Sequence, residues 1–113
     1  MTISYSNFMA PTVLTTAAVT LFTIPATPTT TLLRGGRMRL TNTSVLAATV
    51  TLYAVPAAGT AVAGNAFVSA KSVAANDILD VDLPIIPAGG FVQGLSGTAT
   101  SITAHVLSGS YFS

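Results

Sequence analysis

Charged side chains are scarce in this sequence: it has four lysines or arginines and three aspartates in 113 residues, with no glutamate. Domains that stand alone in water carry about a quarter charged residues, which keep the surface solvated. Half of the residues here are apolar, and many of the others are threonine, serine or glycine. Small and β-branched residues suit pleated sheet and close packing between subunits. We therefore predict that much of the surface faces other protein chains.

Three further absences exclude whole classes of function. The sequence has no cysteine, which excludes disulfides, zinc–thiolate sites and thiol catalysis. With a net charge of +1 it has no basic stripe able to neutralise several phosphates, so we expect no nucleic-acid partner. Threonine, glycine or proline interrupts each apolar run well before the ~18 residues of a membrane helix, so we expect no membrane partner either. Residues 1–10 contain no basic residue and do not resemble a secretory signal.

The dominant pattern is an alternation with period two. In residues 48–55 Val50, Leu52 and Ala54 fall on one face, and threonines and Tyr53 fall on the other, which is typical of a half-buried strand. The same pattern predicts strands at residues 18–24, 30–41, 66–73, 78–83, 91–95 and 101–107, each bounded by proline, glycine or asparagine.

Seven or eight short strands at spacings near ten residues, with no sustained helical stripe, predict an all-β fold. We expect a single antiparallel β-sandwich, jelly-roll-like, with helix limited to a turn or two. The expected organisation is an N-terminal arm or first strand in residues 1–16, followed by the sandwich domain in residues 17–113.

The pair Gly35-Gly36 allows two local structures: a two-residue hairpin, or a bulge within one long strand. A tight hairpin sets Arg34 opposite Arg37, and like charges in that arrangement are unfavourable. We therefore favour the bulge.

Five short segments resemble small virion structural proteins of tailed bacteriophages, in which strands end in comparable turns. They are residues 21–25 (LFTIP), 37–44 (RMRLTNTS), 50–56 (VTLYAVP), 72–76 (SVAAN) and 86–91 (IPAGGF). The resemblance spans about residues 21–106 and departs from the family at Asn76 and Gly90. It implies a β-sandwich virion component, either a capsid decoration or cement protein or a tail-associated one. It brings no catalytic residues and no cofactor.

The charged residues form two strips of matching spacing. Asp80 and Asp82 share one strand face, and Arg37 and Arg39 share a face of another strand. Clustered carboxylates attract hard cations, but the glycine and glutamate of a calcium loop are missing, so an ion-paired or solvated face is favoured over a metal site. The arginines are either solvated or pair with the aspartates, on an adjacent strand or across a subunit boundary.

An enzyme is not expected. His105 is the sole histidine and lies on the polar face of its predicted strand, and no serine stands in a nucleophile-elbow pattern. Residues 42–44 (NTS) match a glycosylation acceptor, but a turn explains them better. Neither a metal ion nor any other cofactor is expected.

Aromatic and apolar residues near the two ends complete the candidate interface. Tyr5, Phe8 and Met9 precede the first clear strand, and Tyr111 and Phe112 end the sequence. Such residues either pack on their own core or anchor a neighbouring subunit. With Arg37, Arg39, Asp80 and Asp82 they make up the predicted interface residues.

Taken with the resemblance, these features predict a structural protein of a phage virion, most simply a capsid decoration or cement protein assembled in the bacterial host cytoplasm. The expected partners are further copies in a homo-oligomer and the major capsid protein or other virion proteins. A tail, collar or adaptor component is the alternative, as is a receptor- or carbohydrate-binding module on the same fold.

Overall fold

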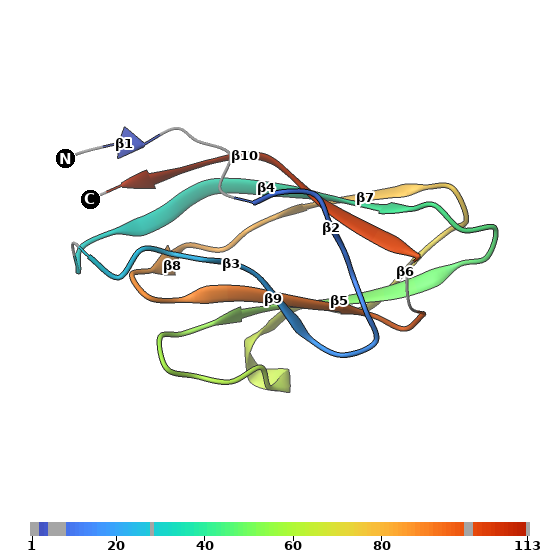
Figure 1. Ribbon diagram of the computed structural model, residues 1–113, viewed down its shortest axis with the longest axis horizontal. Helices are drawn as coiled ribbons and strands as arrows, with labels where there is room; N and C mark the ends of the chain where they lie inside the picture. Colours follow the sequence, from blue (N-terminus) through green and yellow to red (C-terminus); the bar gives the residue numbers. More distant parts are fainter. Residues whose placement is uncertain (1–2, 5–8, 28, 99–100, 113) are drawn as a thin grey trace.

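Two antiparallel sheets stack face to face and enclose one hydrophobic core (Figure 1). The structure is a computed structural model, and it describes residues 3–4, 9–27, 29–98 and 101–112. Sheet A contains β1 (Ile3–Ser4), β2 (Thr12–Val13), β4 (Leu32–Asn42), β7 (Ile78–Asp82), β8 (Ile86–Pro87) and β10 (Ile102–Phe112). Sheet B contains β3 (Val19–Thr23), β5 (Ala48–Val55), β6 (Ala66–Val73) and β9 (Phe91–Ser96). A single turn of 3₁₀ helix, η1 (Ala63–Asn65), precedes β6.

The strand order is that of a jelly roll. Sheet B runs β3-β9-β5-β6, while β10 in sheet A lies between β4 and the short strands β1 and β2, and β4 also pairs with β7. Successive long strands cross from one sheet to the other, except at β5 and β6, which pair within sheet B. Two interlocked Greek keys of this kind define the jelly roll among the sandwich folds. The predicted fold class is therefore confirmed.

The period-two pattern located the long strands correctly, because one face of each strand lies in the core. Strands β5 and β6 begin and end where the alternation predicts, and β3, β4, β7 and β9 differ by one or two residues at their ends. The last strand was predicted too short: β10 continues to Phe112 rather than ending at residue 107. The two-residue strand β8 was not predicted, whereas β1 and β2 lie within residues 1–16, where an arm or a first strand was expected. Among the described residues no helix is long and apolar enough to cross a membrane.

The core is built from aliphatic side chains that the two sheets point toward each other. Leu33, Met38 and Leu40 of β4 meet Leu52 of β5 and Ile102 of β10, and all five are fully buried. Removing one such side chain from water contributes about 1.5–3 kcal/mol to the stability of the folded protein. The alternating pattern along each strand is thus enforced by burial.

The predicted bulge at Gly35-Gly36 is present. Strand β4 runs unbroken through both glycines, and its register with β10 shifts between Arg37↔Ser108 and Arg34↔Ser110. Two residues of β4 therefore stand opposite Gly109 alone. Gly35 has φ +65°, a conformation that side chains with a Cβ adopt with difficulty.

We predict that Gly35→Ala destabilises the protein by about 1 kcal/mol, because the new Cβ meets no atom of the described residues within 4 Å and the effect is backbone strain. Gly64→Ala is the matched control: it also has open space, but no positive φ. The control is expected to be neutral or slightly stabilising. Urea unfolding of both variants measures the difference, and equal stabilities would contradict the bulge geometry.

Candidate interaction surfaces

The two predicted charge strips meet on the outer face of sheet A. The β4–β7 register sets Arg37 opposite Asp82 and Arg39 opposite Asp80. Arg39 donates from Nε and Nη2 to the two carboxylate oxygens of Asp80, at 2.8 and 3.0 Å. Arg37 Nε lies 3.7 Å from Asp82 Oδ1, with both side chains largely exposed. The expected pairing on adjacent strands is therefore present within one chain.

The bidentate pair is electrostatically the stronger of the two. The hydrogen bonds from Arg39 hold the pKa of Asp80 below its ordinary value, although burial opposes this shift. The same contact raises the pKa of Arg39. Two positive and two negative charges also cancel across the strip. Because Arg39 and Asp80 already bond each other and Arg37 lies close to Asp82, an interface role for the four residues stays a prediction.

The aromatic tail belongs to β10 and packs on its own sheet. Phe112 pairs with Ile3 of β1 and Leu32 of β4, and the Arg34 guanidinium carbon lies over its ring, 5.6 Å from the centroid. Tyr111 is partly buried against the core, and burial raises the pKa of its hydroxyl. A further role of Tyr111 and Phe112 as interface anchors stays a prediction.

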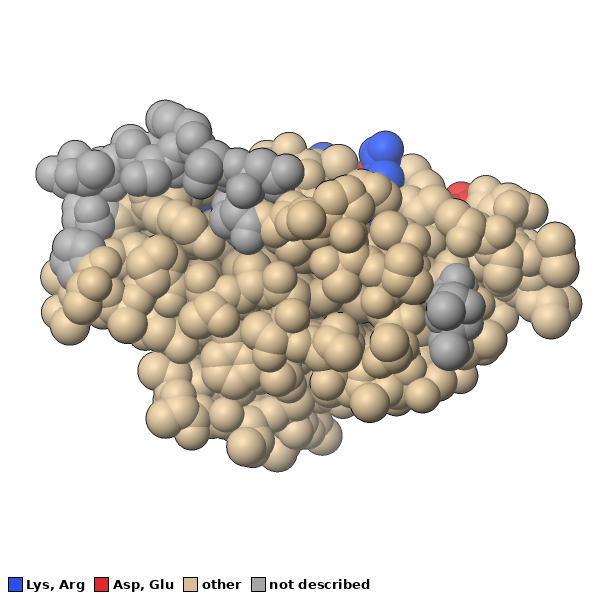
Figure 2. All heavy atoms as spheres, in the orientation of Figure 1, with Lys and Arg blue, Asp and Glu red and all other residues tan. Residues whose placement is uncertain are grey.

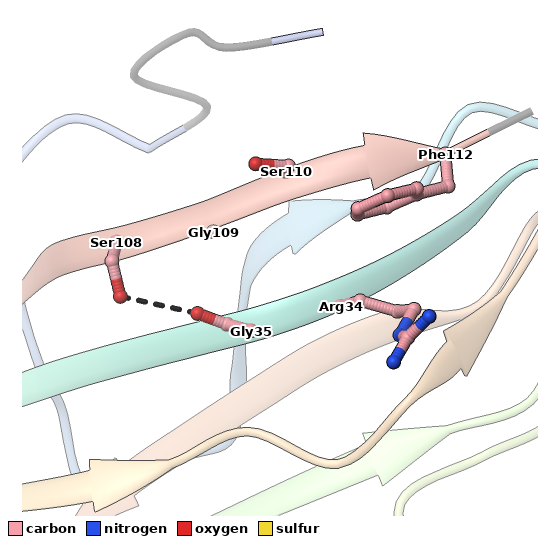
Figure 3. A pocket seen from close by; sticks show the side chains of 6 residues that line it. All are labelled: Arg34, Gly35, Ser108, Gly109, Ser110 and Phe112. Atoms are coloured by element: carbon pink, nitrogen blue, oxygen red, sulfur yellow. Dashed lines mark hydrogen bonds between the residues drawn. The ribbon is translucent and has the colours of Figure 1, made fainter. Parts of the chain in front are cut away.

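Beside this contact lies a shallow open depression of about 390 Å³ over the β4 bulge (Figure 3). Its polar side chains are Arg34, Ser108 and Ser110, and the Ser108 hydroxyl donates to the Gly35 carbonyl at 3.1 Å. The Arg34 guanidinium and the Phe112 ring approach it from adjacent strands. The depression thus brings together the Arg34 guanidinium, which lies over the Phe112 ring, and the hydroxyls of Ser108 and Ser110. The Ser108 hydroxyl is already hydrogen-bonded to the backbone.

Of the N-terminal candidates, Tyr5 and Phe8 lie outside the described residues. Met9 is 5% exposed and belongs to the hydrophobic core. Its side chain therefore reaches a neighbouring subunit only if the core opens.

His105 and Asn42 lie as the strand pattern suggests. His105 is half-buried on the outer face of sheet A, opposite Arg39 in the β10–β4 register. Asn42 ends β4 and is fully buried, and its amide nitrogen donates to the carbonyls of Leu46 and Val73 at 2.8 and 3.0 Å. A buried amide whose nitrogen already donates two hydrogen bonds holds the adjoining turn and is not accessible as a glycan acceptor.

The outer face of sheet B carries no charge on three of its four strands. Strands β3, β5 and β9 contain no charged residue, and β6 contains only Lys71. The side chains between the buried positions include Thr20, Thr49, Thr51, Tyr53, Gln93 and Leu95. In the view of Figure 2, the most prominent Lys, Arg and Asp atoms lie near the upper margin, and most of the other described atoms on this side belong to uncharged residues. The molecule therefore has one charged and one neutral sheet face.

The edge strands of the two sheets, β6 and β7, leave an apolar groove between them. We call this the β6–β7 groove: an open hollow of about 300 Å³ lined by Phe67, Val68, Ser69, Lys71, Leu79 and Val81. Its four apolar residues also pack against the core, so the groove is an exposed flank of the sandwich interior. The strand pattern alone does not reveal it, because it depends on which strands lie at the edges.

The loop that joins β4 to β5, here called the apical loop (residues 43–47), presents two apolar side chains to solvent. Val45 is 83% and Leu46 74% exposed, the highest values among the large apolar residues described. The sequence interpretation stopped at the turn in residues 42–44 and missed them. Two aliphatic residues directly after a turn motif and outside the alternating pattern were the available signal.

No protein-family model matches the sequence, and no curated protein is similar to it. The fold is similar to a chain in the structure of the infectious bursal disease virus Gx strain, with a TM-score of 0.50 and 19% identity over 97% of this chain. A chain of the VP2 subviral particle of the same virus gives a TM-score of 0.45 and 19% identity, again over 97% of this chain. This chain spans about a third of the length of each, 32% and 31%. At such identity the likeness concerns the fold.

We predict energetic coupling between Arg39 and Asp80 and almost none between Arg37 and Asp82. Arg39→Asp alone places like charges together and should destabilise, whereas Arg39→Asp combined with Asp80→Arg should recover part of the loss. The same cycle at Arg37 and Asp82 is the control, because an exposed pair at 3.7 Å contributes little. Denaturant unfolding of the four single and two double variants measures both couplings.

The Arg39–Asp80 pair should also make the stability of the protein depend on pH. A carboxyl whose pKa is lowered by folding stabilises the protein above its unfolded-state pKa and loses that contribution as pH falls toward the folded-state value. The wild type should therefore lose more stability than Asp80→Asn on acidification below the ordinary carboxyl range. Additive effects in the Arg39–Asp80 cycle would contradict the pairing.

Proposed function

We propose that this chain is a structural protein of a virus particle, acting by association rather than catalysis. The observation that carries the proposal is the neutral outer face of sheet B, where β3, β5 and β9 contain no charged residue. Such a face suits burial against protein, since no ionised group has to be stripped of water.

Two further points support a role in a particle. The jelly roll is an architecture that viral capsid domains use repeatedly. The similar solved chain comes from infectious bursal disease virus, although a shared fold alone fixes no function. The charged face of sheet A complements the neutral one, because a protein bound on the outside of a shell needs one face for protein and one for water.

The finer assignment follows the resemblance to tailed-phage virion proteins. We propose a capsid decoration or cement protein that binds the outside of the head, associates with copies of itself and bridges capsid subunits. Each contact is small, and the stabilisation of the shell is the sum over many copies. This assignment also makes the major capsid protein the first partner to test.

Location and copy number in the purified particle test this assignment. A reconstruction by electron cryo-microscopy, with quantitative mass spectrometry, should show hundreds of copies on the outside of the head. A dozen copies or fewer at a vertex or on the tail would replace the decoration role by a tail, collar or adaptor role. Absence of the chain from the particle would overturn the proposal.

We predict that Gln93→Lys weakens attachment to particles that lack the chain by at least about tenfold, because a lysine ammonium would be buried without a partner. Gln93 is half-buried at the centre of the neutral face, between Tyr53 and Thr20. Thr103→Lys is the matched control, half-buried and central on the outer face of sheet A. Pelleting with particles measures the affinities, and equal loss in both variants would contradict attachment through sheet B.

A further inference from the structure

The apical loop and the β6–β7 groove are apolar surfaces that attachment through the face of sheet B leaves open. We infer that they bind each other between copies: Val45 and Leu46 of one copy insert into the β6–β7 groove of the next. The inference deepens the proposed function, on which it rests for the presence of neighbouring copies, by assigning the contact between those copies.

The apical loop is held in one conformation before any partner arrives. The Asn42 amide bridges its two ends, and the Asn42 Oδ1 accepts hydrogen bonds from the Ser44 backbone N–H and hydroxyl at 2.9 and 2.7 Å. The backbone around the two aliphatic residues is therefore fixed by a fully buried side chain. Because little conformational entropy remains to be lost, such a loop binds at lower cost than a mobile one.

The groove is suited to side chains rather than to an added strand. Ala70 of β6 has φ +45°, and its N–H donates to the Thr51 hydroxyl at 3.0 Å, where the β5–β6 register shifts. A bulge of this kind, followed by Lys71, blocks strand addition along an edge. Between the edges, Leu79 and Val81 face Phe67 and Val68 and leave room for two aliphatic side chains.

Charge identifies the occupant as a second copy of this chain. All seven charged residues lie in the described part of the structure: four form the ion pairs of sheet A, and Arg34 rests on the Phe112 ring. Lys71 and Asp77 take part in no ion pair there, and both are exposed.

These two residues have opposite charge and flank the two proposed surfaces. Lys71 lines the groove. The Asp77 carbonyl accepts the Asn42 N–H at 2.9 Å, which places Asp77 at the base of the apical loop. When the loop of one copy enters the groove of another, Asp77 of the first approaches Lys71 of the second. Groove and loop are different surfaces, so each copy uses both, and the contact repeats from copy to copy.

The first test is sedimentation velocity over a concentration series that reaches the millimolar range. The wild type should associate, and Leu46→Asp should weaken the association constant at least about tenfold, as expected for a central apolar anchor. Ile85→Asp is the matched control, since Ile85 is an isomeric side chain with 64% exposure outside both surfaces. A monomeric wild type, or equal effects of the two variants, would overturn the inference.

The decisive experiment mixes a loop variant with a groove variant. Leu46→Asp copies keep an intact groove, and Val81→Asp copies keep an intact loop. Neither variant should associate alone, whereas their mixture should form a one-to-one dimer and nothing larger. Circular dichroism and thermal unfolding verify the fold of each variant. Ser69→Arg serves as a second groove variant: Ser69 lines the groove and is exposed, so the change removes no apolar packing and places a long charged side chain in the groove. Failure of both mixtures to dimerise would overturn the inference.

The charges allow a last check. Lys71→Asp and Asp77→Lys should each weaken association about two- to fivefold, as expected of a pair at the rim, and the double variant should recover most of the loss. The outcomes separate the two proposals. Association abolished by Gln93→Lys but not by Leu46→Asp would overturn this contact and leave the particle role standing. Association that Leu46→Asp abolishes, in a protein absent from the particle, would overturn the particle role and leave this contact standing.

Discussion

The register of β4 between β10 and β7 is the constraint on which the rest of sheet A depends. Because side chains alternate, a slip of one residue would turn Met38 and Leu40 outward and bury Arg37 and Arg39. The Gly35-Gly36 bulge and the extra residue of β10 near Leu107 compensate each other, so the strands regain their pairing beyond both. The Arg39–Asp80 pair closes only in this register, and it reinforces a choice that the core already makes.

At the end of the same strand, the register positions Asn42, and through it the apical loop. Its amide joins the last residue of β4 to the Val73 carbonyl of β6, which ties sheet A to sheet B at this end of the sandwich. A buried amide without these bonds would be strongly unfavourable, so the loop conformation and the packing of the sheets depend on each other. An apolar loop is therefore presented rigidly because a polar side chain is buried beneath it.

The features that could be predicted from the sequence are those in which burial imposes a local pattern of residues. Alternation marked the long strands, the repulsion between Arg34 and Arg37 selected the bulge, and equal spacing matched the arginine and aspartate strips. Two-residue strands carry no alternation, and each exists because a long strand passes beside it: β4 beside β8, and β10 beside β1 and β2. The β6–β7 groove was beyond prediction for the same reason: which strands lie at the edges is a property of the topology. The exposure of Leu46 depends on a bond from Asn42 that only the folded chain makes.

The placement of so few charges gives the molecule two unlike sides. The paired strip of Arg37, Arg39, Asp80 and Asp82 solvates the outer face of sheet A, and its own four charges cancel. The outer face of sheet B, with threonines, Gln93 and Tyr53, is polar yet holds no ion to desolvate on β3, β5 and β9. A charge in the middle of that face would oppose every contact made there. Charge scarcity and sidedness are thus one property: the few ions pair on the outer face of sheet A, and β3, β5 and β9 leave the outer face of sheet B without any.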